Sequence, residues 1–438
     1  MSEIRSTFGR FIRSGWKVKV SALLMGTAQM LYGSIGKGLL FLIFEISVIA
    51  YYLVRGFDDL AGFFTLGTQK ADAWTRTAGD NSVVFLLMGL FSWIVLAVFI
   101  CIYFASIKDA IQTEENIKAG KEPKPFISEL REFSDRKFYI LALILPVIGV
   151  CIFNVLPIVF MILIAFTNFG GSIVPPELVD WVGVENFRKI ITLSQFAPTF
   201  LKILTWNILW AVVSTALNYF AGLGLALLLN KDCVKGKAFW RLFPILAYAI
   251  PGFITLLAFK FMFSYGGPVN YLLKNMGHSA IGFLDIDAKW SARLIGLLVN
   301  CWISVPSIML LSTGHLANRD MALYEAAKID GASSFQQFKS ITMPFMLFVT
   351  MPVLLGQFVA NFNNFGIFYF LRGGLYLDGY FLASDTDLLI NWLYNLSIDN
   401  NYYCIGAAIS LVIFAITSVI SLTIYIRSSS FKEEDTFQ

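Results

Sequence analysis

Eight stretches of the sequence are apolar over about twenty residues or more, which is the length that an α-helix needs to cross the ~30 Å hydrocarbon core of a bilayer. Only 14% of the residues are charged, whereas soluble domains carry about 25%, so soluble enzymes, nucleic-acid binders and disordered scaffolds are largely excluded. The sequence therefore predicts an all-α, polytopic membrane protein with eight transmembrane helices. These spans are expected at roughly 37–55, 82–105, 139–167, 202–229, 240–264, 291–314, 345–370 and 403–427.

The segments between the spans divide the chain into five predicted parts. The first part mixes arginines and lysines with large apolar residues, a composition typical of an amphipathic helix on a membrane surface. The third part is charged and contains two prolines, and it predicts a solvated cytoplasmic linker. The five parts are the interfacial N-terminus 1–36, the helix pair 37–105, the linker 106–138, the six-helix core 139–427 and the cytoplasmic tail 428–438.

Basic residues are distributed unevenly between the two sets of loops. The set that holds both termini contains 22 Lys and Arg residues, and the opposite set contains 10. Cytoplasmic loops of membrane proteins carry the excess of Lys and Arg. We therefore expect a multi-pass protein of the plasma membrane with both termini in the cytoplasm.

Charges within the predicted spans are rare, and they are Glu45 in the first span and Lys260 in the fifth. A charge at the bilayer centre costs ~3 kcal/mol, so each needs a protein partner or a path to the interface. Two isolated charges do not form a proton relay. The sequence therefore favours a structural role for both.

Six uncharged polar residues recur with the spacing i, i+4, i+7, three in the sixth span and three in the seventh. At ~100° per residue, each trio shares one helix face. Amides and hydroxyls form hydrogen bonds, and aromatic faces stack on the C–H faces of a pyranose ring, so the pattern suits a neutral polyhydroxylated ligand. The two trios are Asn300, Ser304 and Ser307, then Gln357, Asn361 and Asn364, and the aromatic stripe beside the second trio is Phe358, Phe362, Phe365 and Tyr369.

Two interpretations of these stripes remain open. The polar residues could line a ligand path, or they could join helices through hydrogen bonds worth roughly 0.6 kcal/mol each while the aromatic residues only pack. The spacing alone does not decide between them. Because the stripes contain no Lys or Arg, an anionic ligand is disfavoured.

The segment 316–344, between the two striped spans, predicts a helix, a sharp turn and a second helix. Asp320 is expected to cap the first helix, and Gly331 stands where helices commonly end in a left-handed residue. Ser333, followed three residues later by Gln336, has the pattern of a capping box. This order of caps and breakers favours a structured element over an ordinary loop.

The same segment resembles the EAA loop of the membrane subunits of binding-protein-dependent ABC importers. In that family the loop docks in a cleft of the cytoplasmic ATP-binding subunit. The matching residues are Glu325-Ala326-Ala327, Asp330-Gly331-Ala332, Phe338, Ile341 and Pro344. The resemblance implies ATPase-coupling roles for Glu325, Ala326, Ala327, Asp330 and Gly331.

Further stretches are similar to the larger permease subunits of maltose/maltodextrin importers, over roughly residues 140–427 and with the eight-helix type I importer fold. The resemblance implies that the two polar trios contact the sugar. It departs at Ser304, Ser307 and Gln357, where an enterobacterial member has Gly, Tyr and Ser. It also departs in the outer loop 168–201, which is too short for that member's large outer domain. The stretches include Asn361-Phe362-Asn363-Asn364-Phe365 and Thr386-Asp387-Leu388-Leu389.

The function implied by the resemblance is that of a transport subunit, not an enzyme. With a second homologous permease, the chain would form the path for maltose and maltodextrins in the lipid bilayer. An extracellular solute-binding protein would deliver the sugar, and two copies of an ABC ATPase would supply energy. The alternatives are a permease for another neutral oligosaccharide or polyol, and an ion-coupled secondary transporter with intramembrane carboxylates and inverted repeats.

Motifs for chemistry on this chain are missing from the sequence. No segment fits the G-x-x-x-x-G-K-[ST] phosphate loop, so we expect ATP to be bound by partner subunits only. The two histidines and five isolated cysteines show no catalytic or metal-ligand spacing. We therefore expect no catalytic residue, no cofactor, no metal and no nucleic-acid partner.

The topology predicts which positions an impermeant thiol reagent reaches in intact cells. In a background without native cysteines, single cysteines in place of Leu60, Asp180 and Tyr380 should react, because these positions lie in the outer loops. A cysteine in place of Gly120 should react only after the membrane is permeabilised. Labelling of the Gly120 position in intact cells would contradict the orientation.

Overall fold

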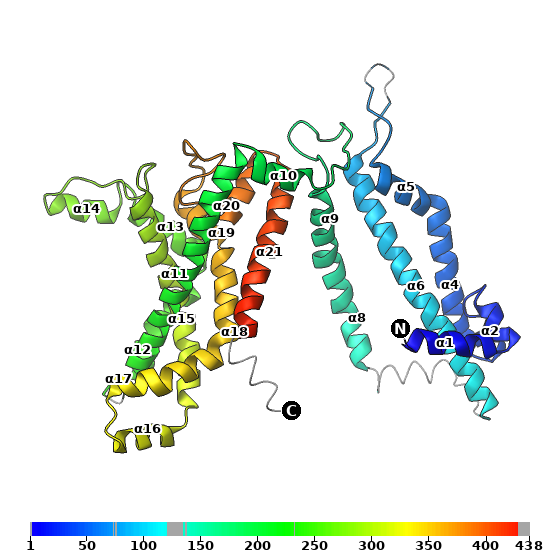
Figure 1. Ribbon diagram of the computed structural model, residues 1–438, viewed down its shortest axis with the longest axis horizontal. Helices are drawn as coiled ribbons and strands as arrows, with labels where there is room; N and C mark the ends of the chain where they lie inside the picture. The colour runs from blue at the N-terminus through cyan, green and yellow to red at the C-terminus, as the bar shows by residue number, and fades with distance from the viewer. Residues whose placement is uncertain are drawn as a thin grey trace. The chain divides into compact units, whose positions relative to one another are not determined.

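The computed structural model describes residues 2–72, 74, 77–120, 135, 138–231 and 233–427. Most of the second half of the predicted linker and the whole predicted tail 428–438 lie outside these residues. The described chain forms two compact units, Met1–Gly183 and Val184–Gln438, and its regular structure is helical apart from isolated bridges such as the one between Thr167 and Trp181. Figure 1 shows the helices with their labels.

Unit 1 contains two long neighbouring helices, α4 and α6, and a group of short helices at one end of them (Figure 1). The helices of unit 1 are α1 (Ser2–Arg13), α2 (Trp16–Ser21), α3 (Thr27–Leu31), α4 (Ile35–Tyr51), α5 (Phe57–Thr65), α6 (Ser82–Lys118), α8 (Phe138–Val150) and α9 (Leu156–Ile164), with π-helical turns η1 (Tyr52–Gly56) and η2 (Cys151–Val155).

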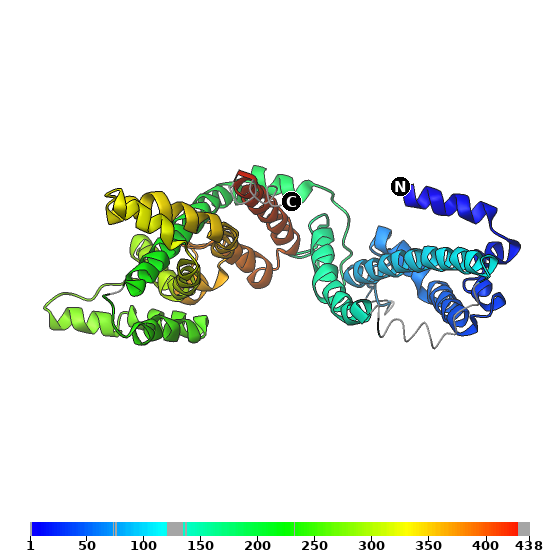
Figure 2. The same ribbon diagram turned by 90° about the horizontal axis from the view of Figure 1, so that it is seen from below.

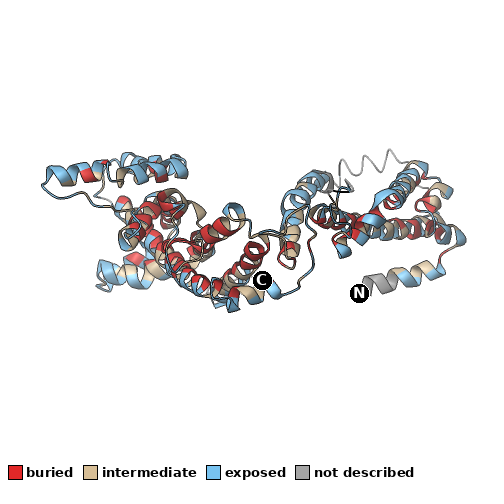
Figure 3. Ribbon diagram, turned by 90° about the horizontal axis from the view of Figure 1, so that it is seen from above, coloured by how far each residue is buried: buried red, intermediate tan, exposed pale blue. Residues whose placement is uncertain are grey.

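Unit 2 contains the remaining long helices. In Figure 3 its buried residues lie where these helices meet, and the outward faces are exposed. They are α10 (Glu185–Thr192), α11 (Phe196–Asn230), α12 (Lys237–Ala249), α13 (Gly252–Met262), α14 (Pro268–Asn275), α15 (Lys289–Ala317), α16 (Met321–Ile329), α17 (Ser334–Gln337), α18 (Met343–Phe362), α19 (Phe365–Arg372), α20 (Leu389–Tyr394) and α21 (Tyr403–Arg427), with π-helical turns η3 (Phe338–Thr342) and η4 (Asn395–Asp399).

Seven helical runs of the described chain are long and apolar enough to cross a membrane, and an eighth is present if a bent pair counts as one span. This agrees with the predicted all-α membrane fold, with a correction for the fifth span. The sequence predicts one helix over 240–264, whereas α12 and α13 meet at an angle of 92°. The physical reason is Pro251, which lacks the N–H needed to continue a helix and stands at the start of α13.

The N-terminal helices α1 to α3 pack on the end of α6, and this changes the predicted start of the linker. The sequence places solvated linker from residue 106, but α6 continues to Lys118. Val18 and Ala28 bury Ala110 and Ile111. Two acidic residues of this part of α6 also have partners in the N-terminus, because Glu115 pairs with Arg10 and Glu114 accepts from the Gly15 amide at 3.0 Å.

The two charges inside the predicted spans differ in their surroundings. Glu45 is buried on α4 and accepts a hydrogen bond from the Met25 amide at 2.8 Å. Lys260 is exposed in the last turn of α13. Close backbone packing beside Glu45 requires glycine, because a Cβ on Gly26 (φ +82°) would stand 2.0 Å from the carbonyl oxygen of Gly38.

The core of unit 2 consists of two apolar clusters that follow one another along α11 and α15. One cluster contains Trp206, Trp210, Ile295, Val299 and Phe368, and it lies toward the start of α11 and α15. The other lies toward their ends. Its members are Tyr219, Leu223, Ala226, Leu229, Ile308, Met309, Leu316 and Met346. The residues between the two clusters therefore occupy a layer of their own.

Candidate functional site

Three asparagines of the predicted stripes meet between the two apolar clusters of unit 2. The Asn300 amide on α15 donates to the Asn361 side-chain oxygen on α18 at 3.2 Å. The Asn364 amide donates to the Asn300 side-chain oxygen, also at 3.2 Å. Asn361 in turn donates to the Thr215 hydroxyl of α11 at 3.0 Å. A continuous chain of hydrogen bonds, which we call the asparagine layer, thus joins three membrane-crossing helices.

The central amides of the asparagine layer are buried. Asn300 and Asn361 are each 3% exposed, whereas Asn364 and Thr215 are half-buried. Amides buried in apolar surroundings are costly unless they are hydrogen-bonded, and here each of the three amides is bonded. The layer therefore gives α15 and α18 one defined register relative to each other.

The other three predicted site residues lie near the layer without joining it. Ser304, Ser307 and Gln357 are half-buried. The Ser307 hydroxyl donates to the Ser304 carbonyl of its own helix at 2.8 Å. In the described part of the chain, the Gln357 side chain has no hydrogen-bond partner. The structure thus brings together the asparagines but not the complete stripes.

The seventh span is interrupted at the asparagine layer, whereas the sequence predicts a continuous helix there. α18 ends at Phe362, and Asn364 caps α19 by accepting from the Ile367 amide at 3.3 Å. This break also divides the predicted aromatic stripe. Phe358 and Phe362 are buried in the core. The ring of Phe365 stacks on that of Tyr369, with 4.5 Å between the ring centres.

Thr215 was missed by reasoning from the sequence. It lies in a span that the sequence analysis did not single out, and its contact with Asn361 joins positions 146 residues apart. The available signal was a hydroxyl in the middle of a long apolar helix. Such a residue is expected to bond across helices, but its partner cannot be read from spacing.

The segment 316–344, here called the connecting segment, has the predicted caps. Asp320 accepts from the Ala322 amide at 2.9 Å, and Gly331 has a φ of +79°. The Ala332 amide bonds the Ala327 carbonyl at 2.9 Å, which completes a Schellman turn. Ser333 and Gln336 form the expected capping box. The helix, turn and helix predicted from the sequence are therefore confirmed.

The predicted coupling residues lie on the outer side of the connecting segment, which is yellow at the lower left of Figure 1 and nearest the viewer in Figure 2. Glu325, Ala326, Asp330 and Gly331 are exposed, and Ala327 is half-buried. Beside them, two large apolar side chains are exposed, Ile329 at 87% and Phe335 at 69%. On the inner side, the Tyr324 hydroxyl is 2.9 Å from that of Thr342 and holds α16 against η3.

Both helices of the asparagine layer continue into the connecting segment. α15 runs from Lys289 through Asn300 to Ala317, directly before Asp320. On the other side, α17, η3 and α18 follow one another without a gap from Ser334 to Phe362. A displacement of the connecting segment therefore reaches both sides of the layer through helices, each of which contains one internal proline, Pro306 in α15 and Pro352 in α18.

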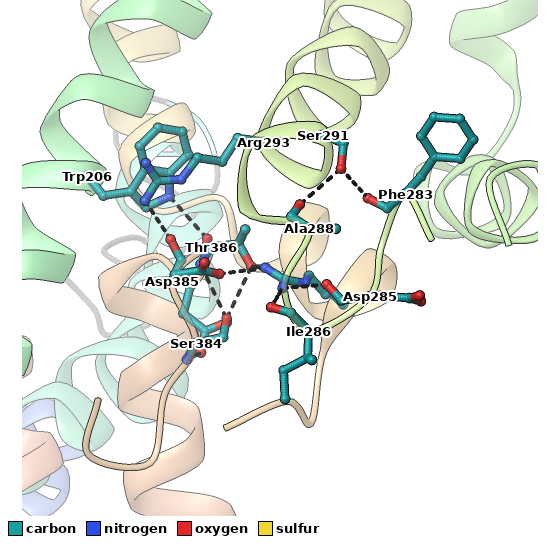
Figure 4. A network of polar contacts seen from close by, with 12 residues as sticks. Trp206, Phe283, Asp285, Ile286, Ala288, Ser291, Arg293, Ser384, Asp385 and Thr386 are labelled. Atoms are coloured by element: carbon teal, nitrogen blue, oxygen red, sulfur yellow. Dashed lines mark hydrogen bonds and ion pairs between the residues drawn. The ribbon is translucent and has the colours of Figure 1, made fainter. Parts of the chain in front are cut away.

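At the opposite end of α15 and α19, a buried ion pair ties the chain together (Figure 4). Arg372, the last residue of α19, pairs with Asp385 at 2.6 Å, and their side chains are 1% and 10% exposed. Its second nitrogen donates to the carbonyls of Asp285 and Ile286 at 2.7 and 2.6 Å. The arginine thus joins α19 to the segment before α15 and to the segment before α20.

Two neighbouring residues extend this network, here called the arginine network. Arg293 donates to the Asp385 carbonyl, and its guanidinium lies 3.6 Å from the centre of the Trp206 ring. Nearby, burial raises the pKa of Asp387 to about 6 although the amide and hydroxyl of Ser384 oppose this shift. The network therefore fixes the ends of three helices at the side remote from the connecting segment.

Cavities and metal-binding groups do not point to another centre. A hollow of about 680 Å³ lies between α11 and α12, lined mainly by apolar residues such as Leu225, Leu228, Trp240 and Phe243, and it contains none of the predicted site residues. Within the described residues, no group of three His, Cys, Asp or Glu side chains is arranged to hold a metal ion.

Comparison with known proteins gives consistent results. Residues 218–430 match the family model described as binding-protein-dependent transport system inner membrane component. The chain is 32% identical over 430 residues to the maltodextrin transport system permease protein MalC of Streptococcus pneumoniae, covering 96% of this chain and 97% of that protein. It is 35% identical to the galactooligosaccharides transport system permease protein GanP of Bacillus subtilis, covering 91% and 94%.

Two further matches cover only part of this chain. A maltose/maltodextrin permease MalF of Vibrio parahaemolyticus is 33% identical over 262 residues, which is 58% of this chain and 49% of that one. Among solved structures, a bacterial ABC transporter for import of the acidic polysaccharide alginate is similar with a TM-score of 0.55 and 21% identity, over 68% of this chain and 96% of the other. This structural likeness shows the shared fold.

The buried ion pair predicts a strong response to loss of one partner. Arg372→Met leaves the Asp385 carboxylate buried and unpaired, and we expect it to lower stability by about 3–5 kcal/mol. Replacing both residues, with Arg372→Met and Asp385→Leu, should recover much of this loss because the carboxylate is removed together with its ion-pair partner. Thermal unfolding of the purified protein measures both, and a double variant no more stable than the single one would contradict the assignment.

Proposed function

Because the chain belongs to the inner-membrane components of binding-protein-dependent transport systems, we propose that it is a pore-forming permease subunit of an ATP-driven importer for maltodextrin-type sugars. Its partners in this proposal are a second homologous permease, two copies of an ABC ATPase and an extracellular solute-binding protein. The chain itself binds no ATP and catalyses no reaction. Both termini lie in the cytoplasm.

The observation that carries the proposal is the asparagine layer. Its amides lie between two apolar clusters and offer neutral donors and acceptors at one level of three helices. Such groups match sugar hydroxyls, and the half-buried Ser304, Ser307 and Gln357 add further polar atoms on the same helices. In this proposal, sugar hydroxyls replace some of the bonds between the asparagines when the helices separate.

Support for a maltodextrin-type sugar comes from the full-length relatives. Permeases named for maltodextrin transport match over 96% of this chain in both Streptococcus pneumoniae and Bacillus subtilis. A second candidate, a galactooligosaccharide, is supported by the 35% identity to GanP. Both sugars are neutral, in agreement with stripes that contain no Lys or Arg. An ion-coupled mechanism has less support because Glu45 already accepts a backbone hydrogen bond.

The mechanism uses the connecting segment as a lever. Closure of the ATPase pair would displace α16 and its exposed residues Glu325 and Ile329. Because helices lead from this segment to both Asn300 and Asn361, the displacement would separate or rejoin the two sides of the asparagine layer. The sugar would then pass from the binding protein to the layer and on to the cytoplasm.

Removing two amides from the layer tests its role in transport. Asn361→Leu combined with Asn364→Leu should remove at least two sugar hydrogen bonds of ~1 kcal/mol each, which corresponds to roughly a thirtyfold loss of uptake. Asn363→Leu is a matched control, because Asn363 is exposed at the same helix break. The measurement is uptake of radiolabelled maltotriose, normalised to the amount of assembled complex. Wild-type uptake by a well-assembled double variant would contradict the site assignment.

The connecting segment gives a second test of the proposal. Gly331→Pro should abolish uptake and loosen the ATPase, because proline cannot adopt the positive φ observed there. Glu325→Lys should do the same by reversing the charge of an exposed contact residue. Gly331→Asn is the control, since asparagine tolerates the left-handed conformation. Co-purification of the ATPase and sugar-stimulated hydrolysis are the measurements, and normal values for both damaging variants would refute the lever.

A further inference from the structure

The orientation of the Asn364 side chain depends on the break between α18 and α19. In a continuous helix the Asn364 side chain could not cap the residues that follow it, whereas here it accepts from the Ile367 amide and donates to Asn300. A helix that ends inside a membrane protein leaves its last carbonyls without helical partners. Those carbonyls must be satisfied by other groups for the break to persist in an apolar environment.

Two buried asparagines outside the stripes hold this break. The Asn207 amide on α11 donates to the carbonyl of Phe362, the last residue of α18, at 3.1 Å. The Asn391 amide on α20 donates to the carbonyl of Phe365 at 2.8 Å. This carbonyl begins α19 and is not one of the unpaired ones, so the bond anchors α19 beside the break. The two donors therefore bind the backbone on either side of Asn363 and Asn364.

Each of these side chains is also fixed at its other end. The Asn207 oxygen accepts from the Leu389 amide at 2.9 Å, and the Asn391 oxygen accepts from the Leu388 amide at 3.1 Å. Both residues are buried, Asn207 at 0% exposure and Asn391 at 3%. Their amides are thus held rigidly between the start of α20 and the helix break.

We infer that Asn207 and Asn391 are positioning residues for the substrate site. They set the geometry of the break and through it the direction of Asn364, without contacting the substrate themselves. This inference rests on the proposed function, because it assigns these residues to the site at the asparagine layer. It predicts that they influence which sugar is preferred and not only how stable the chain is.

Isosteric substitutions can remove the donors alone. Asn207→Asp keeps the acceptor for the Leu389 amide, and Asn391→Asp keeps the acceptor for the Leu388 amide. When ionised, each carboxylate has no proton to donate and places an oxygen against the carbonyl at the break. Because burial favours the protonated form of a carboxyl group, the variants are compared at alkaline pH. Asn270→Asp is the matched control. Asn270 is equally buried. It accepts from the Ile281 amide at 2.8 Å and donates to the Ser264 and Ile281 carbonyls, none of which belongs to α18 or α19.

The first readout is the relative uptake of maltose, maltotriose and longer maltodextrins by the complete importer in proteoliposomes. A merely structural defect lowers uptake of all sugars in proportion. We expect the ratio of uptake rates between short and long sugars to change at least fivefold in Asn207→Asp and Asn391→Asp, and to stay within twofold in Asn270→Asp. Unchanged ratios in both variants, in a wild-type importer that takes up these sugars, would overturn the inference.

The second readout needs no sugar and separates this inference from the proposed function. Amide hydrogen exchange over residues 361–370 should be at least tenfold faster in both variants than in the wild-type complex and in Asn270→Asp. If the wild-type importer takes up no maltodextrin, the proposed substrate is wrong, and this exchange still decides whether the two asparagines hold the break. Wild-type exchange in both variants would overturn the inference whatever the substrate.

Discussion

The hydrogen bond between Asn300 and Asn361 is the contact that sets the register of α15 and α18, and the proposed coupling depends on it. It joins α15 and α18 in the middle of an apolar bundle, and the same two helices are joined a second time by the connecting segment. The two helices are thus linked at two levels. A force applied at the connecting segment must therefore either move both helices together or separate the amides, and the second outcome opens polar groups to a ligand.

The position of this contact explains why it can serve a polar ligand without weakening the fold. Apolar clusters lie on both sides of the asparagine layer, so the helices remain packed whether or not the amides are bonded to one another. An interhelical hydrogen bond in a membrane protein contributes roughly 0.6 kcal/mol. A ligand that offers several hydroxyls can replace bonds of that strength, whereas it cannot replace the packing of Trp210 or Met309. At the far end, Arg372 ties α19 to the segment before α20 through the ion pair with Asp385, and to the segment before α15 through the carbonyls of Asp285 and Ile286.

The sequence predicts the parts of this structure that depend on local chemistry. The apolar spans, the caps at Asp320 and Ser333 and the left-handed Gly331 each depend on residues within a few positions, and the structure confirms them.

The bend at Pro251 and the break at Asn363–Asn364 were missed because hydropathy continues across both. Their local signals were a Pro-Gly pair and a pair of cap-forming asparagines. The packing of α1 on α6 and the bond from Thr215 to Asn361 join residues about a hundred or more positions apart, so spacing within one helix carries no information about them. The roles of the six stripe residues in binding a sugar remain predictions.

Photolabelling with a maltotriose analogue that carries a small photoreactive group tests the central claim most directly. The complete importer would be illuminated with the analogue during ATP turnover, and the labelled peptides identified by mass spectrometry. The asparagine layer predicts label in the peptides that contain residues 300–307 and 357–364, with loss of that label when excess maltotriose is added. Label confined to other peptides, such as those lining the hollow between α11 and α12, or label that maltotriose does not displace, would contradict it.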